Sequence, residues 1–131
     1  MSEENVERVR GSFAAFNRGD FEAAIGAYHP EVEWIPYLGA VDRPVYRGHE
    51  ELMGMWSEFK ENLGLRLEVK EWIDADDTVI TVVEFRGVGT SSGAEVHQTW
   101  AQMYSIRDGL IVRVEPFADK DAALEAAGLS E

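Results

Sequence analysis

The sequence contains no cysteine, and this absence removes several kinds of chemistry at once. Disulfide bonds, thiolate nucleophiles and metal sites built on cysteine are excluded. Long apolar runs are also missing, because no stretch approaches the roughly 20 apolar residues of a membrane-spanning helix. The opening segment MSEENVERVR carries acids where a secretory signal has a basic end, so we expect a cytoplasmic protein.

Basic residues are scarce. The chain has 12 lysines and arginines against 25 aspartates and glutamates, which gives a formal net charge of -13. A field of this sign repels phosphate backbones and anionic lipid surfaces. We therefore expect no nucleic acid partner and no membrane partner.

The length and composition predict one folded domain over residues 1–131. A chain of 131 residues can bury about two thirds of its unfolded surface around a single core. Its 45% apolar and 28% charged residues are typical of globular proteins. No internal repeat, linker or low-complexity tract suggests a second domain.

The first half of the chain predicts three helices. Apolar residues at helical spacing run through residues 2–18, and Gly19 can end this helix in a left-handed conformation. Asp20 can then cap a short second helix, which Pro30 stops. A third helix over residues 48–63 begins with two glutamates, which favour the positive end of its dipole.

Beyond the third helix the apolar residues alternate with a period of two, which predicts strands. The predicted strands span 65–73, 78–88, 96–106 and 110–117, in addition to a short strand at 32–35. The Asp108-Gly109 pair is a strong signal for a tight hairpin, so the sheet should be mainly antiparallel. Asp119 can cap a last helix over residues 122–127.

The segments NRGDFEAAIGAYHPEVEW, YRGHEELMGMW and SIRDGLIVRV resemble the SnoaL-like branch of the nuclear transport factor 2-like superfamily, relatives of ketosteroid isomerases and polyketide cyclases. The order of helices and strands is similar along almost the whole chain. This resemblance implies an α+β, cone-shaped fold, a curved and mainly antiparallel sheet wrapped by three N-terminal helices, with a short C-terminal helix. It also implies one small-molecule pocket and, because such sheets usually pair through an outer face, a homodimer.

The catalytic residues of the better-known relatives are largely absent. The residues that ketosteroid isomerases use fall at Ser12, Ile35 and Gln102, so the carboxylic base is missing. The acid of SnoaL-type cyclases also falls at Gln102, and their histidine falls at Val114. Neither an amide nor a valine can shuttle protons. Steroid isomerisation and cyclisation by those mechanisms are therefore not expected.

Alternation along the two longest strands sorts their side chains into two faces. Even positions mix apolar and polar groups, which is typical of a pocket: Ile80, Val82, Glu84, Arg86, Gln98, Trp100, Gln102 and Tyr104. Odd positions are apolar and offer a packing or dimer surface: Val79, Val83, Phe85 and Met103. A single β-bulge would exchange these faces.

Glu84 and Arg86 form the candidate catalytic pair, with Gln102 as a further polarising group. A carboxylate and a guanidinium two positions apart can act as a general base and its orienting partner. They can equally form a structural or interface ion pair. Limonene-type epoxide hydrolases carry an Arg and an Asp in this region, in the reverse order.

Aromatic and amide side chains supply the candidate ligand-binding wall. These residues are Trp34, Trp56, Phe59, Gln98, Trp100 and Tyr104. Such a wall suits a hydrophobic small molecule, although the same rings can form a core without any ligand.

A metal site is not predicted. His29 ends a predicted helix and has no second histidine to pair with it, and the aspartates over 74–77 lack the glycine and terminal glutamate of a calcium loop. We expect neither a metal nor an organic cofactor.

Two functions fit the sequence, and it leaves open whether the protein is an enzyme. In the first, a SnoaL-like pocket catalyses cofactor-free proton transfer or hydrolysis on a hydrophobic small molecule, with Glu84 as the base. In the second, the protein is a non-catalytic ligand-binding or dimeric interaction module. The missing family acids favour the second.

Overall fold

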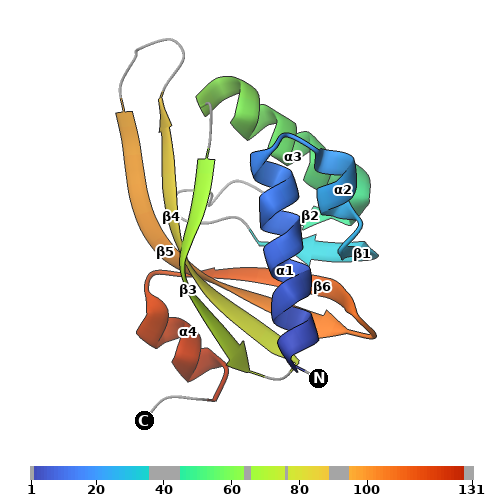
Figure 1. Ribbon diagram of the computed structural model, residues 1–131, viewed down its shortest axis with the longest axis vertical. Helices are drawn as coiled ribbons and strands as arrows, with labels where there is room; N and C mark the ends of the chain where they lie inside the picture. Colours follow the sequence, from blue (N-terminus) through green and yellow to red (C-terminus); the bar gives the residue numbers. More distant parts are fainter. Residues whose placement is uncertain (1, 36–44, 64–65, 76, 89–94, 129–131) are drawn as a thin grey trace.

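The computed structural model describes residues 2–35, 45–63, 66–75, 77–88 and 95–128 (Figure 1). The elements in chain order are α1 (Ser2–Asn17), α2 (Phe21–Ile25), β1 (Tyr28–Trp34), β2 (Tyr46–Arg47), α3 (Gly48–Leu63), β3 (Arg66–Ala75), β4 (Thr78–Val88), β5 (Glu95–Arg107), β6 (Leu110–Phe117) and α4 (Lys120–Ala126). Three N-terminal helices, a run of long strands and a short last helix confirm the predicted α+β arrangement. No helix within these ranges is long and apolar enough to cross a membrane.

The strands form one sheet with the order β2-β1-β6-β5-β4-β3. Within the described ranges, β1 and β6 pair in parallel and every other neighbouring pair is antiparallel. The sheet is strongly twisted and curved, and the long strands β3, β4 and β5 fan outward from its centre (Figure 1).

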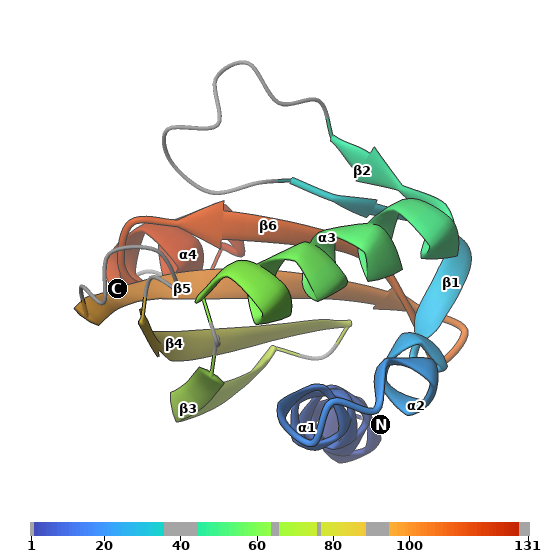
Figure 2. The same cartoon turned by 90° about the horizontal axis from the view of Figure 1, so that it is seen from above.

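The two faces of the sheet are covered by different helices. The inner face of the sheet carries Val83, Trp100 and Tyr104, which pack with residues of α1 and α3 in the main core. The outer face carries Ile80 and Ala101, which pack against Ala123 of α4. In Figure 2, α3 runs across one side of the sheet and α4 lies on the other.

The predicted junction of the first two helices is confirmed. Gly19 has a φ of 81°, which a side chain would disfavour, and the Asp20 side chain accepts a hydrogen bond from the Ala23 backbone N–H at 3.1 Å. The second helix is shorter than predicted, because β1 already begins at Tyr28 and includes Pro30. The pairing of β1 with β6 is irregular between positions 28 and 33. The missing N–H of Pro30 therefore removes no regular ladder hydrogen bond there.

The β5–β6 hairpin turns as its sequence predicts. Asp108 and Gly109 have φ values of 52° and 78°, the left-handed pair that a two-residue hairpin loop requires. After β6, the Asp119 side chain accepts a hydrogen bond from the Ala122 backbone N–H at 2.9 Å and caps α4.

The predicted grouping of strand faces is wrong. In the antiparallel register of β4 and β5, Thr81 lies opposite Gln102 and Val83 lies opposite Trp100. Directly opposed residues point to the same face, so odd positions of β4 share the inner face with even positions of β5. Alternation within one strand shows which residues lie together on that strand, whereas the register between two strands depends on how they are connected.

The predicted apolar dimer surface is not a surface. Val79 and Val83 are completely buried in the main core beneath the helices. Met103 lies on the outer face and packs against the cluster beneath α4. The side chain of Phe85 lies outside the described residues. Val79 and Val83 are therefore core residues, because the register of β4 places them on the inner face.

Candidate functional site

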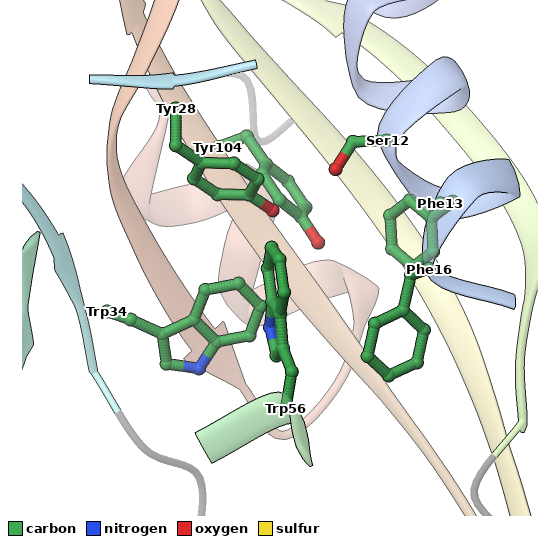
Figure 3. A pocket seen from close by; sticks show the side chains of 7 residues that line it. All are labelled: Ser12, Phe13, Phe16, Tyr28, Trp34, Trp56 and Tyr104. Atoms are coloured by element: carbon green, nitrogen blue, oxygen red, sulfur yellow. The ribbon is translucent and has the colours of Figure 1, made fainter. Parts of the chain in front are cut away.

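A small cavity lies between the inner face of the sheet and the helices α1 and α3 (Figure 3). Seven side chains line this aromatic pocket: Ser12, Phe13, Phe16, Tyr28, Trp34, Trp56 and Tyr104. The space open to the centre of a water-sized sphere is about 20 Å³. This is room for about one water molecule.

The pocket residues come from four elements whose local patterns aim them inward. On α1, Phe16 lies one turn beyond Ser12 and Phe13, and all three are on the buried side of the helix. On β1, Tyr28 and Trp34 both point to the helices, with rings 6.3 Å apart. Trp56 and Tyr104, from α3 and β5, complete the wall.

The aromatic rings contact one another edge to face. Trp56 lies 5.4 Å from Tyr28 and 6.3 Å from Trp34 between ring centroids, with interplanar angles of 69° and 84°. Such pairs each contribute about 0.5–1.5 kcal/mol beyond the burial of their area. Trp34 is half-buried, whereas the other six lining residues are at most 8% exposed. Trp34 therefore lies at the mouth of the pocket.

The polar groups of the pocket gather at one end. In Figure 3 the hydroxyl groups of Tyr28 and Tyr104 lie side by side and the Ser12 hydroxyl points toward them. Ser12 donates a hydrogen bond to the backbone oxygen of Ala24 at 3.1 Å, and Tyr28 is hydrogen-bonded to Ser12. Tyr104 donates to Oε1 of Gln102 at 3.0 Å. The pocket thus combines an apolar wall with a small hydroxyl network.

Both phenols stay neutral. Burial raises the pKa of Tyr28 well above its usual value, although its bond to Ser12 opposes this slightly. Burial also raises the pKa of Tyr104, and the nearby Tyr28 raises it further. At neutral pH these groups give and accept hydrogen bonds without carrying charge. The seven lining residues include no carboxylate and no histidine.

The structure brings some of the predicted ligand-binding residues together. Trp34, Trp56 and Tyr104 line the pocket. Trp100 is buried on the same inner face but does not line the cavity. The side chains of Phe59 and Gln98 lie outside the described residues.

Sequence reasoning missed Ser12, Phe13, Phe16 and Tyr28 as pocket residues. The apolar stripes gave no reason to separate these aromatics from ordinary core residues. A usable signal was the position of Ser12, where ketosteroid isomerases keep a catalytic residue. Gln102, a second such position, lies directly behind Tyr104.

The predicted catalytic residues are not brought together. Glu84 and Arg86 lie on β4 opposite Thr99 and His97, and therefore on the outer face, whereas Gln102 lies on the inner face. The Glu84 carboxylate is 3.4 Å from Lys70 Nζ and 3.3 Å from Arg86 Nε. Glu84 thus belongs to an ionic cluster on the opposite side of the sheet from the aromatic pocket.

The histidines whose side chains are described bind the backbone. His29 Nδ1 accepts a hydrogen bond from the Glu31 N–H at 2.9 Å, and His49 Nε2 donates to the Tyr28 backbone oxygen at 2.8 Å. Within the described part of the chain, no group of three or more histidine, aspartate or glutamate side chains is placed to hold a metal ion.

Several known proteins are similar to this chain. An uncharacterised PhzA/B-like protein of Pseudomonas aeruginosa is 28% identical over 120 residues, covering 89% of this chain and 85% of the relative. A nuclear transport factor 2-like protein of Burkholderia thailandensis is 26% identical, with a TM-score of 0.79 over 97% of this chain and 98% of that chain. TerC, co-crystallised with polyporic acid, is 25% identical, with a TM-score of 0.77 over 95% of this chain and 98% of that chain.

The fold, the buried pocket and these similarities agree with the match to a family model. The model for the SnoaL-like domain matches residues 9–114, a span that runs from α1 to β6 and includes all seven pocket residues. The chain belongs to the SnoaL-like domain family.

Proposed function

We propose that the protein is a ligand-binding protein whose aromatic pocket binds a small hydrophobic molecule that carries one polar group. The observation that carries this proposal is the lining itself: six aromatic rings with a neutral hydroxyl network at one end. Apolar walls with a few placed polar groups are typical of small-molecule sites. That TerC, a similar protein, was crystallised with polyporic acid supports the same conclusion.

Ligand entry requires the pocket to expand. Its free space of about 20 Å³ is far too small for a molecule with an aromatic ring. Trp34 is the half-buried member of the lining and lies at the end of β1, so it loses the least buried contact when it turns outward. We propose that the Trp34 side chain turns outward to admit the ligand while the other rings stay in place.

Binding fits this pocket better than acid-base catalysis. A general base works best when its pKa lies near the working pH. The pKa values of Tyr28 and Tyr104 are raised by burial, so neither phenol becomes a phenolate at neutral pH. Glu84 lies on the other face of the sheet. Proton transfer driven by Glu84 therefore has no support from the geometry.

Isothermal titration calorimetry with a panel of substituted naphthalenes tests the proposal. We expect at least one compound to bind, and Trp56→Leu to weaken its binding by tenfold or more. Trp72→Phe is the matched control, since Trp72 contacts Phe13 and Arg10 without lining the pocket. Failure of the whole panel to bind, or equal weakening by both variants, would contradict the proposal.

We further propose that two copies pair through the outer face of the sheet in the cytoplasm. Lys70 and Arg86 lie there beside Glu68 and Glu84. A patch with both signs of charge can match its own copy across a twofold axis. Sedimentation that gives a mass of 14.7 kDa at micromolar concentration would contradict the homodimer. Cell fractionation tests the location.

A further inference from the structure

We infer that the Trp34 indole occupies the place of the ligand, so that the ligand buries a flat, fused bicyclic aromatic ring where this indole now lies. This inference rests on the proposed function and adds two points to it. One is the shape of the buried part of the ligand. The other is that the ligand competes with a side chain of the protein itself.

The Trp34 indole lies against three buried rings of the pocket. Its centroid is 6.3 Å from those of Tyr28 and Trp56 and 6.5 Å from that of Tyr104. The planes of Trp56 and Tyr104 make angles of 84° and 85° with the indole, and that of Tyr28 is tilted by 38° (Figure 3). We call these three rings the indole site. They come from β1, α3 and β5 and are at most 4% exposed.

The rings of the indole site are held by contacts that do not involve Trp34. Trp56 packs edge to face on Phe16 of α1, with ring centroids 5.7 Å apart. Tyr104 donates a hydrogen bond to Oε1 of Gln102 at 3.0 Å. These rings therefore keep their places when the indole leaves, and the site is ready to receive another ring.

Only the side chain of Trp34 has to move. Its backbone lies opposite Tyr46 of β2 on one side and Val114 of β6 on the other. The N–H of the next residue, Ile35, donates to the Val114 backbone oxygen at 3.0 Å. The Trp34 side chain is half-buried, so water already reaches part of it. A rotation of this side chain therefore opens the indole site while β1 stays in the sheet.

The space that the indole leaves favours a flat aromatic ring. Aromatic pairs prefer edge-to-face or offset arrangements with centroids about 4.5–7 Å apart. A fused bicyclic ring in the plane of Trp34 renews all three contacts of the indole. A saturated ring is thicker and lacks the negative face of an aromatic ring, so it cannot renew them. The indole site thus selects a flat aromatic body rather than any apolar one.

Trp34 competes with such a ligand. While the indole is in place the site is closed, and the apparent affinity falls in proportion to the fraction of molecules in which the site is open. Removing the indole removes this reduction. If Trp34 were instead a wall against which the ligand packs, its removal would weaken binding. The two arrangements therefore predict effects of opposite sign.

Calorimetry with 2-naphthol at pH 7 measures this sign. We expect Trp34→Ala to bind 2-naphthol at least fivefold more tightly than the wild type, and the addition of Trp56→Leu to abolish the gain. Trp72→Ala is the matched control, because Trp72 is also half-buried but does not line the pocket, and it should keep the wild-type affinity within a factor of two. A smaller gain or a loss in Trp34→Ala, a gain that survives Trp56→Leu, or an equal gain in Trp72→Ala would overturn the inference. Trp34→Val takes the same test if Trp34→Ala does not fold.

A matched pair of compounds tests the shape of the ligand. 2-Naphthol and 5,6,7,8-tetrahydro-2-naphthol share the phenol and the carbon skeleton, but the second ring of the latter is saturated and puckered. We expect the wild type and Trp34→Ala to prefer 2-naphthol at least fivefold, although burial of apolar area alone favours the tetrahydro compound. A smaller or reversed preference would overturn the inference and leave the proposed function standing, since both compounds are hydrophobic and carry one polar group. Binding of neither compound to either protein would overturn both.

Discussion

Tyr104 donates its hydroxyl proton to Oε1 of Gln102, two positions before it on β5, across 3.0 Å. Both side chains are buried. Ketosteroid isomerases, which this chain resembles, keep a protonated carboxylic acid at the position of Gln102, and such an acid donates a hydrogen bond. The amide oxygen of Gln102 instead accepts one. The same place in the fold therefore orients Tyr104 rather than supplying a proton.

Removing the Tyr104 hydroxyl should destabilise the protein. In Tyr104→Phe the buried Gln102 oxygen loses its donor, and an unsatisfied buried acceptor costs about 1–3 kcal/mol. Urea denaturation measures the loss. The double variant Tyr104→Phe with Gln102→Leu is the control, because it removes both partners and should lose less than the sum of the single variants. Strictly additive losses would contradict the hydrogen bond.

Alkaline pH should unfold the protein through its buried tyrosines. Burial raises the pKa of Tyr28 and Tyr104 above the usual 10.0. As the pH passes about 10 the unfolded chain loses these protons while the folded protein keeps them, so stability falls as the pH rises. The contribution of the two protonated tyrosines to stability is fully present below pH 10. It is lost as the pH rises from 10 through the folded pKa, by about 1.4 kcal/mol per pH unit for each tyrosine.

Urea titrations at pH 9, 10 and 11 measure this dependence. The double variant Tyr28→Phe with Tyr104→Phe should show a clearly shallower decline than the wild type. An identical slope in the two proteins would show that other groups dominate the alkaline transition.

Substitutions of the two pocket indoles, Trp56 and Trp34, should differ in their effects on stability and on ligand entry. Trp56 is 4% exposed, so Trp56→Ala should cost about 3–5 kcal/mol. Trp34 is half-buried, so Trp34→Ala should cost roughly half as much. If Trp34 closes the mouth, its removal should also speed ligand association in stopped-flow fluorescence. Slower or unchanged association would contradict its role at the mouth.

Glu84→Gln should leave ligand binding unchanged. The carboxylate lies on the outer face, where it is 3.4 Å from Lys70 and 3.3 Å from Arg86. The side chains of the two basic partners are 48% and 65% exposed, so losing these ion contacts should lower the unfolding free energy by about 1 kcal/mol or less. Calorimetry should give the wild-type affinity within a factor of two. A tenfold loss of affinity without a change of fold would show that Glu84 contributes to ligand binding and would contradict its assignment to the outer face.

Most of the fold could be predicted because local signals agree with the tertiary structure. The helix over residues 48–63 and the strands over 78–88 and 110–117 have the predicted bounds. Gly19 and the Asp108-Gly109 turn adopt the left-handed backbone that their sequences favour. The short strand β2 was missed, since two residues carry no periodicity.

The site was predicted only in part, because it depends on contacts between distant segments. Trp34, Trp56 and Tyr104, three of the predicted ligand-binding residues, line the aromatic pocket. Glu84 was grouped with it because both strands were sorted by even numbers, whereas the register pairs odd positions of β4 with even positions of β5. Ser12 is marked only by the family resemblance and Tyr28 by no sequence pattern, and it is the tertiary fold that brings both to the same pocket as Tyr104.

The most direct test of the pocket is the response of the indole N–H signals in a ¹H–¹⁵N NMR spectrum during titration with 2-naphthol. The chain has four tryptophans, at positions 34, 56, 72 and 100, which single Trp→Phe variants assign. If the ligand enters the aromatic pocket, the signals of Trp34 and Trp56 should shift most while that of Trp72 stays in place. Shifts confined to Trp72, or saturable binding that moves neither Trp34 nor Trp56, would contradict the account.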